Sequence, residues 1–436
     1  MAEQASPPGA QDDLDRAYAA YFRSKPRFPD TPSITVVENA LVSPASFHVF
    51  RDRNPDRARL ASLMAAFGPG FRFRSVFDAG VHTAEGRCVI PAIHFSNRRR
   101  AVPPPRRTPG PEAEPIAGTW IYAGALHQHP GHFVTESIGR LWGVPQAGPG
   151  VQGLIWHALD PPKADAPQGR AVPFRPGSVQ ADVLECLGIP LPRLIVQRPL
   201  RVERLLVPDQ LMALDEGPLL AGHPAFRRFL HERLITGEAP EQGGYRLFVS
   251  RAGLGARQSS FILEDRMEEV LRAQGWRILR PETLPLREQL AAYAGASDLL
   301  FSEGSSLHFY ALVARPGQRV VILRRRLEHK RHIAAQLRLM GLESVQEWLC
   351  VEAMVTPLRD PAAPPAEHGL TTRPLLDFEE LRTRLAEAGM LRPDSPPFAS
   401  REELTRELDR LGAEWRAQGY GLALQPVGQG DGPDEE

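Results

Sequence analysis

Lysine is the scarcest charged residue in this chain. Only three lysines, Lys25, Lys163 and Lys330, stand among 52 basic residues, so arginine carries almost all of the positive charge. The 52 basic residues are balanced by 52 acidic ones. A formal net charge of zero provides no general attraction to nucleic acid or to an anionic membrane. We therefore expect no nucleic-acid partner.

Cysteine is also scarce, and its pattern excludes two kinds of site. The three cysteines, Cys88, Cys186 and Cys350, are widely spaced and form no CxxC pair. Disulfide frameworks and thiolate metal sites use several cysteines at characteristic spacings. The sequence predicts neither kind of site and favours a reducing compartment.

Long apolar runs are missing. No segment approaches the roughly 18–20 apolar residues that a membrane-spanning helix needs. The N-terminal string MAEQASPPGAQDDLD lacks the basic and apolar blocks of a signal peptide. These absences predict a cytoplasmic protein. A peripheral contact with the inner face of the plasma membrane stays open, and the arginine-rich run over 324–338 is the candidate segment.

The length of 436 residues indicates two or three domains. The ends, 1–30 and 425–436, are rich in Pro, Gly and acidic residues, and we expect them to be disordered. Between them we expect an N-terminal α/β domain over 31–238, a second α/β domain over 239–345 and a helical extension over 346–424.

The second domain has the clearest alternation of strands and helices. Repeating βα units of this size predict a parallel sheet covered on both faces. The expected strands are 245–250, 276–280, 298–302 and 319–323. The expected helices are 264–274, 286–295 and 306–314.

Polar side chains follow three of these strands. Ser250 and Arg251 end the first, Glu282 follows the second, and Glu303 and Gly304 follow the third. Open parallel sheets bind ligands outside the carboxyl ends of their strands. We therefore expect a ligand at this edge, and these residues are suited to a nucleotide sugar.

Two arginines and a Gly-Ser-Ser turn are the candidate anion contacts. Arg251 and Arg257 flank a glycine-bearing loop, so their guanidinium groups can converge on a diphosphate; solvated arginines are the alternative. Gly304 permits a tight turn before Ser305 and Ser306, which place an N-cap and free backbone N–H groups where an anion can dock. An ordinary capped core helix is the alternative.

Two further side chains belong to the same candidate set. Glu282 can accept hydrogen bonds from ribose or sugar hydroxyl groups. His308 lies one turn into the last helix, where it either faces the ligand or is a satisfied buried histidine.

The first domain carries a histidine-rich string, HQHPGHFVTESIGRLW, over 127–142. His132 and Glu136 are four residues apart, so on a helix the carboxylate can orient the imidazole and raise its basicity. A neutral imidazole near pH 7 is suited to removing a proton from a hydroxyl group. A purely structural pair is the alternative. His127 and His129 add metal-ligating side chains, but the string lacks the spacing of the cupin metal motif.

In order and spacing these strings resemble glycosyltransferase family 61, in its bacterial capsular polysaccharide branch, over roughly 118–325. The matching strings are GHFxxExxxRLW at 131–142, FVSRAGLGAR at 248–257, PExLPLxEQ at 281–289 and GSSLH at 304–308.

The resemblance implies a GT-B fold, with two facing Rossmann-like domains and parallel sheets. It implies inverting, metal-independent transfer from a nucleotide-sugar donor to a hydroxyl of a polysaccharide or lipid-linked glycan acceptor. His132 and Glu136 would be catalytic on the acceptor side. The resemblance places Arg251, Arg257, Glu282, Gly304 and Ser305 on the donor side. We expect Ser250, Glu303, Ser306 and His308 to belong to the same donor site.

The metal motif of the other main glycosyltransferase fold has no counterpart after a strand. The only Asp-x-Asp is Asp13-Leu14-Asp15, in the N-terminal end that we expect to be disordered. We therefore expect no metal cofactor. Two other functions stay open: a His/Glu metal-dependent hydrolase, and a catalytically silent scaffold that binds sugar nucleotides or polysaccharide.

Overall fold

The structure is a computed structural model in which the chain divides into two compact units, Met1–Arg233 (unit 1) and Leu234–Glu436 (unit 2). Most of the two ends expected to be disordered lies outside the described residues. The described residues are 16, 19–20, 29–49, 65–66, 75–94, 100–101, 110, 112–158, 174–214, 220–235, 244–254, 259–328, 332–359 and 371–427.

Unit 1 is built on a seven-stranded sheet with the order β3-β2-β1-β7-β4-β5-β6. Its strands are β1 (Ile34–Val49), β2 (Ser75–His82), β3 (Arg100–Ala101), β4 (Glu114–Leu126), β5 (Val151–Ala158), β6 (Arg193–Ile195) and β7 (Leu200–Pro208). β7, β4, β5 and β6 run parallel, but β1 is antiparallel to both β2 and β7. The sheet is therefore mixed and not wholly parallel as expected, because a strand's residues reveal its β-propensity and not its direction.

The connection between β4 and β5 changes its helix type twice. It runs through α3 (Pro130–His132), the π-helical turn η2 (Phe133–Ser137) and the 3₁₀ turn η3 (Ile138–Gly143). Single π-helical turns are rare and occur often at functional sites. The other helical elements of this unit are η1 (Ile90–Ala92), α4 (Val179–Cys186) and α5 (Pro224–Leu234), which ends at the boundary with unit 2.

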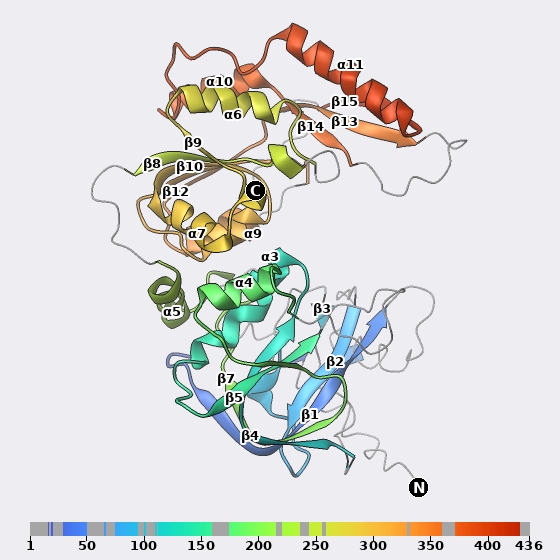
Figure 1. Cartoon of the computed structure of the whole chain (residues 1–436), viewed down its shortest axis with the longest axis vertical. Helices are drawn as coiled ribbons and strands as arrows, with labels where there is room; N and C mark the ends of the chain where they lie inside the picture. Colours follow the sequence, from blue (N-terminus) through green and yellow to red (C-terminus); the bar gives the residue numbers. More distant parts are fainter. Residues whose placement is uncertain are drawn as a thin grey trace. The chain divides into compact units, whose positions relative to one another are not determined.

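Unit 2 contains a five-stranded, wholly parallel sheet, which confirms the predicted one. Its strands are β8 (Tyr245–Val249), β9 (Arg277–Leu279), β10 (Ala296–Ser302), β11 (Arg319–Leu323) and β12 (Ser344–Trp348). Its helical elements are η5 (Ala252–Leu254), α6 (Glu264–Ala273), η7 (Pro281–Thr283), α7 (Leu286–Gly295), α8 (Ser306–Ala311) and α9 (His332–Leu339). Figure 1 shows α6 on one face of the sheet and α7 and α9 on the other.

The strand order β12-β11-β10-β8-β9 is that of a doubly wound, flavodoxin-like sheet. In such a sheet the direction of winding reverses between the first and third strands, which here are β8 and β10. Helices leave the sheet toward opposite faces at this point and open a crevice at the carboxyl ends of the two strands. The topology therefore predicts the ligand site of unit 2 after residues 249 and 302.

The C-terminal part of unit 2 combines helices with a small antiparallel sheet of order β14-β13-β15. Its elements are β13 (Val351–Arg359), β14 (Arg373–Leu376), α10 (Phe378–Glu387), α11 (Arg401–Ala417) and β15 (Tyr420–Pro426). The helical extension expected over 346–424 thus also contains strands. Their signal was present, since Val351, Ala353 and Val355 are buried in alternation.

Two hydrophobic clusters join this part to the rest of unit 2, one through the parallel sheet and one through Ile262 before α6. Leu271 of α6 and Leu381 of α10 share a core with Val321 of β11. Trp415 of α11 is fully buried in a second core with Val355 of β13. The C-terminal part is therefore packed into unit 2.

Among the described helices, none is long and apolar enough to cross a membrane. The basic run over 324–338 is not a continuous basic surface, because Arg324 and Arg325 are only 6% and 4% exposed. The three cysteines are free thiols, as their spacing predicted.

Candidate functional site

The strand ends of unit 2 bring together residues from two of the predicted motifs. Arg251 follows β8, and Gly304 follows the neighbouring strand β10. A Cβ atom at position 304 would lie 2.5 Å from Nη1 of Arg251, so a larger residue there would shift this guanidinium group from its present position. The close approach gives the glycine of the Gly-Ser-Ser turn a specific role at the switch point.

Glu264, at the start of α6, ties the two strand ends together. Its carboxylate accepts hydrogen bonds from the backbone N–H of Arg251 at 2.7 Å and from the hydroxyl of Ser302 at 2.5 Å. Ser250 Oγ lies 3.3 Å from the same oxygen, which gives Ser250 a structural contact. Glu264 is 1% exposed, and burial raises the pKa of its carboxyl group. In the sequence, Glu264 is recognisable only as an acidic residue in the first turn of a predicted helix.

Arg325 adds a second buried guanidinium group just after β11. Its Nε donates to the backbone oxygen of Glu303 at 2.5 Å, and its Nη1 donates to the backbone oxygen of Ser259. Glu303 Oε2 in turn accepts the backbone N–H of Arg325 at 2.9 Å. The sequence did not single out Arg325, because it stands inside a run of arginines that reads as surface charge.

Arg251 and Arg325 lie near one another and share nearby carboxylates, including those of Glu264 and Glu303. Burial lowers the pKa of Arg325 to about 10, and the positive charge of Arg251 adds to this effect. Burial is also the largest cause that lowers the pKa of Arg251. Partly desolvated like charges at a strand edge are typical of a site that receives negative charge from a ligand.

The other predicted donor-side residues have different surroundings. Glu282 is exposed in η7 and lies against Gly253, in the turn after β8. Arg257 lies outside the described residues, so its convergence with Arg251 stays a prediction.

The turn before α8 differs from the expected cap. Ser305 occupies the N-cap position but makes no side-chain cap hydrogen bond, and Ser306 begins a helix of only six residues. His308 Nδ1 lies 3.3 Å from Gln336 Oε1, and its ring stacks on His332 with centroids 5.9 Å apart. Both partners belong to α9, which favours the packing role for His308.

In unit 1, His132 and Glu136 are in direct contact. His132 Nδ1 lies 2.5 Å from Glu136 Oε1. The Glu136 side chain is fully buried, whereas 29% of the His132 side chain is exposed. The pair therefore has a buried carboxylate at one end and an accessible imidazole at the other. The predicted proximity arises in a π-helical turn and not in a regular α-helix.

Glu136 also lies near two buried histidines. Its Oε2 is 3.8 Å from His127 Nε2, and one ligand atom each from His94, His127 and Glu136 lie within 4.8 Å of one another. Burial lowers the pKa of His94 well below its usual value, which keeps its imidazole neutral. These three residues have the chemistry of a divalent metal site. His94 was missed because no local spacing links residue 94 to the later string.

Arg140 lies beside this cluster and opposes a cation there. Its guanidinium group donates to the backbone oxygens of Pro91 at 2.8 Å and Ile93 at 2.9 Å, and also to that of Pro208. Its positive charge contributes to the lowered pKa of His94. Arg140 thus has a structural role and raises the cost of placing a metal ion near Glu136.

The fold and the two sites define an α/β enzyme in which one unit carries a histidine–carboxylate pair and the other carries arginines at the switch point of a doubly wound sheet. Residues 131–322 match the family model described as Glycosyltransferase 61, which confirms the predicted family. These residues form a glycosyltransferase 61 region, and the chain is a glycosyltransferase. A comparison with curated proteins gives no match. The matched region begins next to His132 and ends in β11, so it leaves out the C-terminal part of unit 2.

Proposed function

We propose that the chain transfers a sugar from a nucleotide-sugar donor to a hydroxyl of a polysaccharide or lipid-linked glycan, with inversion and without a metal ion. Unit 2 binds the donor and unit 1 supplies the base, which is the division of labour of a GT-B enzyme. Such acceptors belong to capsular polysaccharide synthesis in the bacterial cytoplasm. A lipid-linked acceptor would bring the enzyme to the inner face of the plasma membrane.

The contact between His132 and Glu136 carries this proposal. A buried carboxylate 2.5 Å from Nδ1 favours the tautomer with the proton on Nδ1, which leaves the Nε2 lone pair available. The acceptor oxygen attacks the anomeric carbon while Nε2 takes its proton. The bond from the anomeric carbon to the diphosphate oxygen breaks in the same displacement, which inverts the configuration. Glu136 then stabilises the imidazolium ion.

Arg251 and Arg325 act on the leaving group. The departing nucleoside diphosphate gains negative charge as its bond to the sugar breaks, and guanidinium groups already in place stabilise this charge. A metal ion is another way to stabilise this charge, so the arginines support a metal-independent reaction. Arg257, Glu282 and Ser305 remain proposed donor contacts.

The direct test is turnover with identified products. Nucleotide sugars are first screened for thermal stabilisation of the protein, because a ligand that binds the folded state raises its stability. The best donor is then incubated with glycan acceptors, and NMR gives the anomeric configuration of the product. We expect inversion and release of nucleoside diphosphate. Donor binding without any turnover would favour the silent scaffold, and retention would contradict single displacement.

A further inference from the structure

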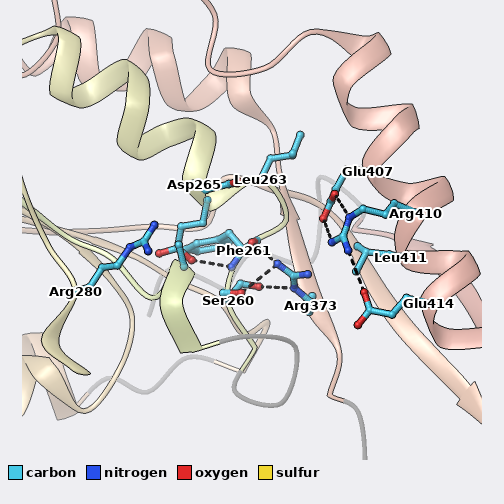
Figure 2. A pocket seen from close by; sticks show the side chains of 12 residues that line it. Ser260, Phe261, Leu263, Asp265, Arg280, Arg373, Glu407, Arg410, Leu411 and Glu414 are labelled. Carbon is cyan, nitrogen blue, oxygen red and sulfur yellow. Dashed lines mark hydrogen bonds and ion pairs between the residues drawn. The ribbon is translucent and has the colours of Figure 1, made fainter. Parts of the chain in front are cut away.

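A cavity of about 420 Å³ lies in unit 2, and Figure 2 shows residues that line it. Ala252, Glu264 and Arg280 line one side, at the carboxyl ends of β8 and β9. Arg373 of β14 and Arg410 of α11 line the other side. The second wall comes from the C-terminal part, which lies outside the matched residues 131–322.

The cavity begins where the arginine site ends. Ala252 directly follows Arg251, and Glu264 both lines the cavity and accepts the backbone N–H of Arg251 at 2.7 Å. Arg251 does not itself line the cavity, so a molecule whose diphosphate lies against Arg251 would reach the cavity by extending past Ala252. In doubly wound sheets that bind nucleotides, the ribose lies toward the end of the second strand, which here is β9.

Hydrogen bonds from Nε and Nη2 hold the Arg373 side chain in the cavity wall, and its Nη1 remains available to a ligand. Its Nη2 donates to Phe261 O at 2.8 Å and to Ser260 Oγ at 3.1 Å, and its Nε donates to Ser260 O at 3.2 Å. Within the described part of the chain, Nη1 makes no hydrogen bond. Arg373 is 9% exposed, so this donor is available mainly to a ligand in the cavity.

The charge of Arg410 in the α11 wall is already compensated, and the two carboxylates around it leave this wall net negative. Arg410 binds both carboxylate oxygens of Glu407 at 2.8 Å and one oxygen of Glu414 at 3.0 Å, as Figure 2 shows. Further carboxylates on the opposite side disfavour an anionic group inside the cavity. Leu411 and Phe261 add apolar surface between the polar groups. The lining therefore suits a neutral, flat or ring-shaped group with several hydrogen-bonding atoms.

We propose that this cavity binds the nucleoside of the donor, and that the C-terminal part of unit 2 thereby selects which nucleotide sugar is used. Arg373 Nη1 donates to a carbonyl oxygen of the base or to a ribose oxygen. The cavity volume lies within the range of about 300–1,000 Å³ that is usual for small-molecule sites. This assignment rests on the proposed function, because it takes the diphosphate at Arg251 as its starting point.

The test uses calorimetry on the full chain with two probes, the best-binding nucleoside diphosphate and inorganic diphosphate. Arg373→Gln should weaken the nucleoside diphosphate at least about tenfold and leave inorganic diphosphate unchanged within about twofold. Ala252→Leu narrows the cavity from the opposite wall and is expected to change the two affinities in the same way. It replaces Arg373→Gln as the test if that variant fails to fold. Arg406→Gln is the matched control, since this α11 arginine is 69% exposed and does not line the cavity.

Arg251→Ala separates failure of this inference from failure of the proposed function. We expect it to weaken both probes. If it weakens both while Arg373→Gln and Ala252→Leu weaken neither, the cavity does not bind the nucleoside and the inference is overturned. If Arg251→Ala weakens neither probe, the diphosphate site itself is wrong. If the cavity variants weaken only binding of a free sugar or glycan, the cavity belongs to that ligand instead.

Discussion

The two units differ in the ionisable side chains near their candidate sites: unit 1 has buried histidines, and unit 2 has arginines. Burial lowers the pKa of His82 and His157 to about 4 each, and it also lowers that of His94 well below its usual value. In unit 2, Arg251 and Arg325 stay charged at neutral pH even with lowered pKa values. A neutral imidazole can accept a proton, whereas a guanidinium ion can only stabilise charge. Under the proposed function, proton transfer belongs to His132 of unit 1, whose side chain is 29% exposed, and leaving-group stabilisation belongs to the arginines of unit 2.

Burial alone does not make an arginine functional, as Arg140 shows. Arg140 is 1% exposed and donates to three backbone oxygens, so its donors serve the fold of unit 1. Arg251 is only partly buried and lies at the switch point, against a glycine that leaves room for it. Accessibility at a strand end distinguishes Arg251 from Arg140, whereas Arg325 is 4% exposed and adds positive charge beside Arg251.

The largest effect is expected from removing the base. His132→Ala should lower kcat by about 100- to 10,000-fold, the usual contribution of a general base. Glu136→Gln should lower it less, because the amide can still orient the ring. His129→Ala is the control, since its ring lies close to His132, with centroids 5.3 Å apart. Steady-state kinetics decide the point, and a greater loss in His129→Ala would move the base to His129.

Acid should destabilise unit 1 through its buried histidines. The pKa of His157 is about 4 in the folded protein, against about 6.5 in an unfolded chain, so the unfolded chain binds more protons between these values. Its contribution is fully present above pH 6.5 and is lost as the pH falls toward 4. The loss is about 3 kcal/mol of unfolding free energy. The free energy of unfolding, measured in urea, should be lower at pH 5 than at pH 7. This difference should be smaller in His157→Gln.

Loss of a charge-assisted contact in the donor site should have a smaller effect, which is a lower affinity for the nucleoside diphosphate. Arg251→Ala and Arg325→Ala should each weaken binding of the nucleoside diphosphate by about 1.5–3 kcal/mol, the range for hydrogen bonds to charged groups. Arg338→Ala is a control from the same basic run, because its side chain is exposed on α9. Calorimetry measures the affinities. Equal affinity in wild type and in both folded variants would remove the arginines from the site.

Metal removal should have the smallest effect. Exhaustive treatment with EDTA is expected to leave transfer unchanged, because guanidinium groups supply the positive charge at the diphosphate. Metal content and turnover are measured before and after treatment. One tightly bound zinc or manganese ion per chain that is required for transfer would contradict this. His94→Ala would then show whether the cluster of His94, His127 and Glu136 holds the ion.

Local sequence patterns were most informative in unit 2. The predicted helix over 286–295 matches α7 residue for residue, and the predicted strand over 319–323 matches β11. Short βα units bury their apolar residues with clear periodicity, so their type and order can be read locally. In unit 1 the antiparallel pairing of β1 with β7 joins residues far apart in the chain, and no local pattern specifies it.

The same limit applies to the candidate sites. His132 and Glu136 could be paired from their spacing, because one helical turn brings them together. Glu264, Arg325 and His94 reach their sites only through tertiary contacts, and each reads locally as an ordinary polar residue. Arg373 is a further case, since it approaches Ser260 across 113 residues of sequence.

The division of roles between the units is tested most directly by measuring donor affinity and single-turnover rate on the same two variants. The account predicts that His132→Ala binds the donor within about twofold of wild type but loses at least about 100-fold in rate at saturating donor and acceptor. Arg251→Ala should instead lose at least about tenfold in donor affinity. If His132→Ala weakened donor binding as much as Arg251→Ala, or kept more than about a tenth of the wild-type rate, the assignment of the base to unit 1 would be contradicted.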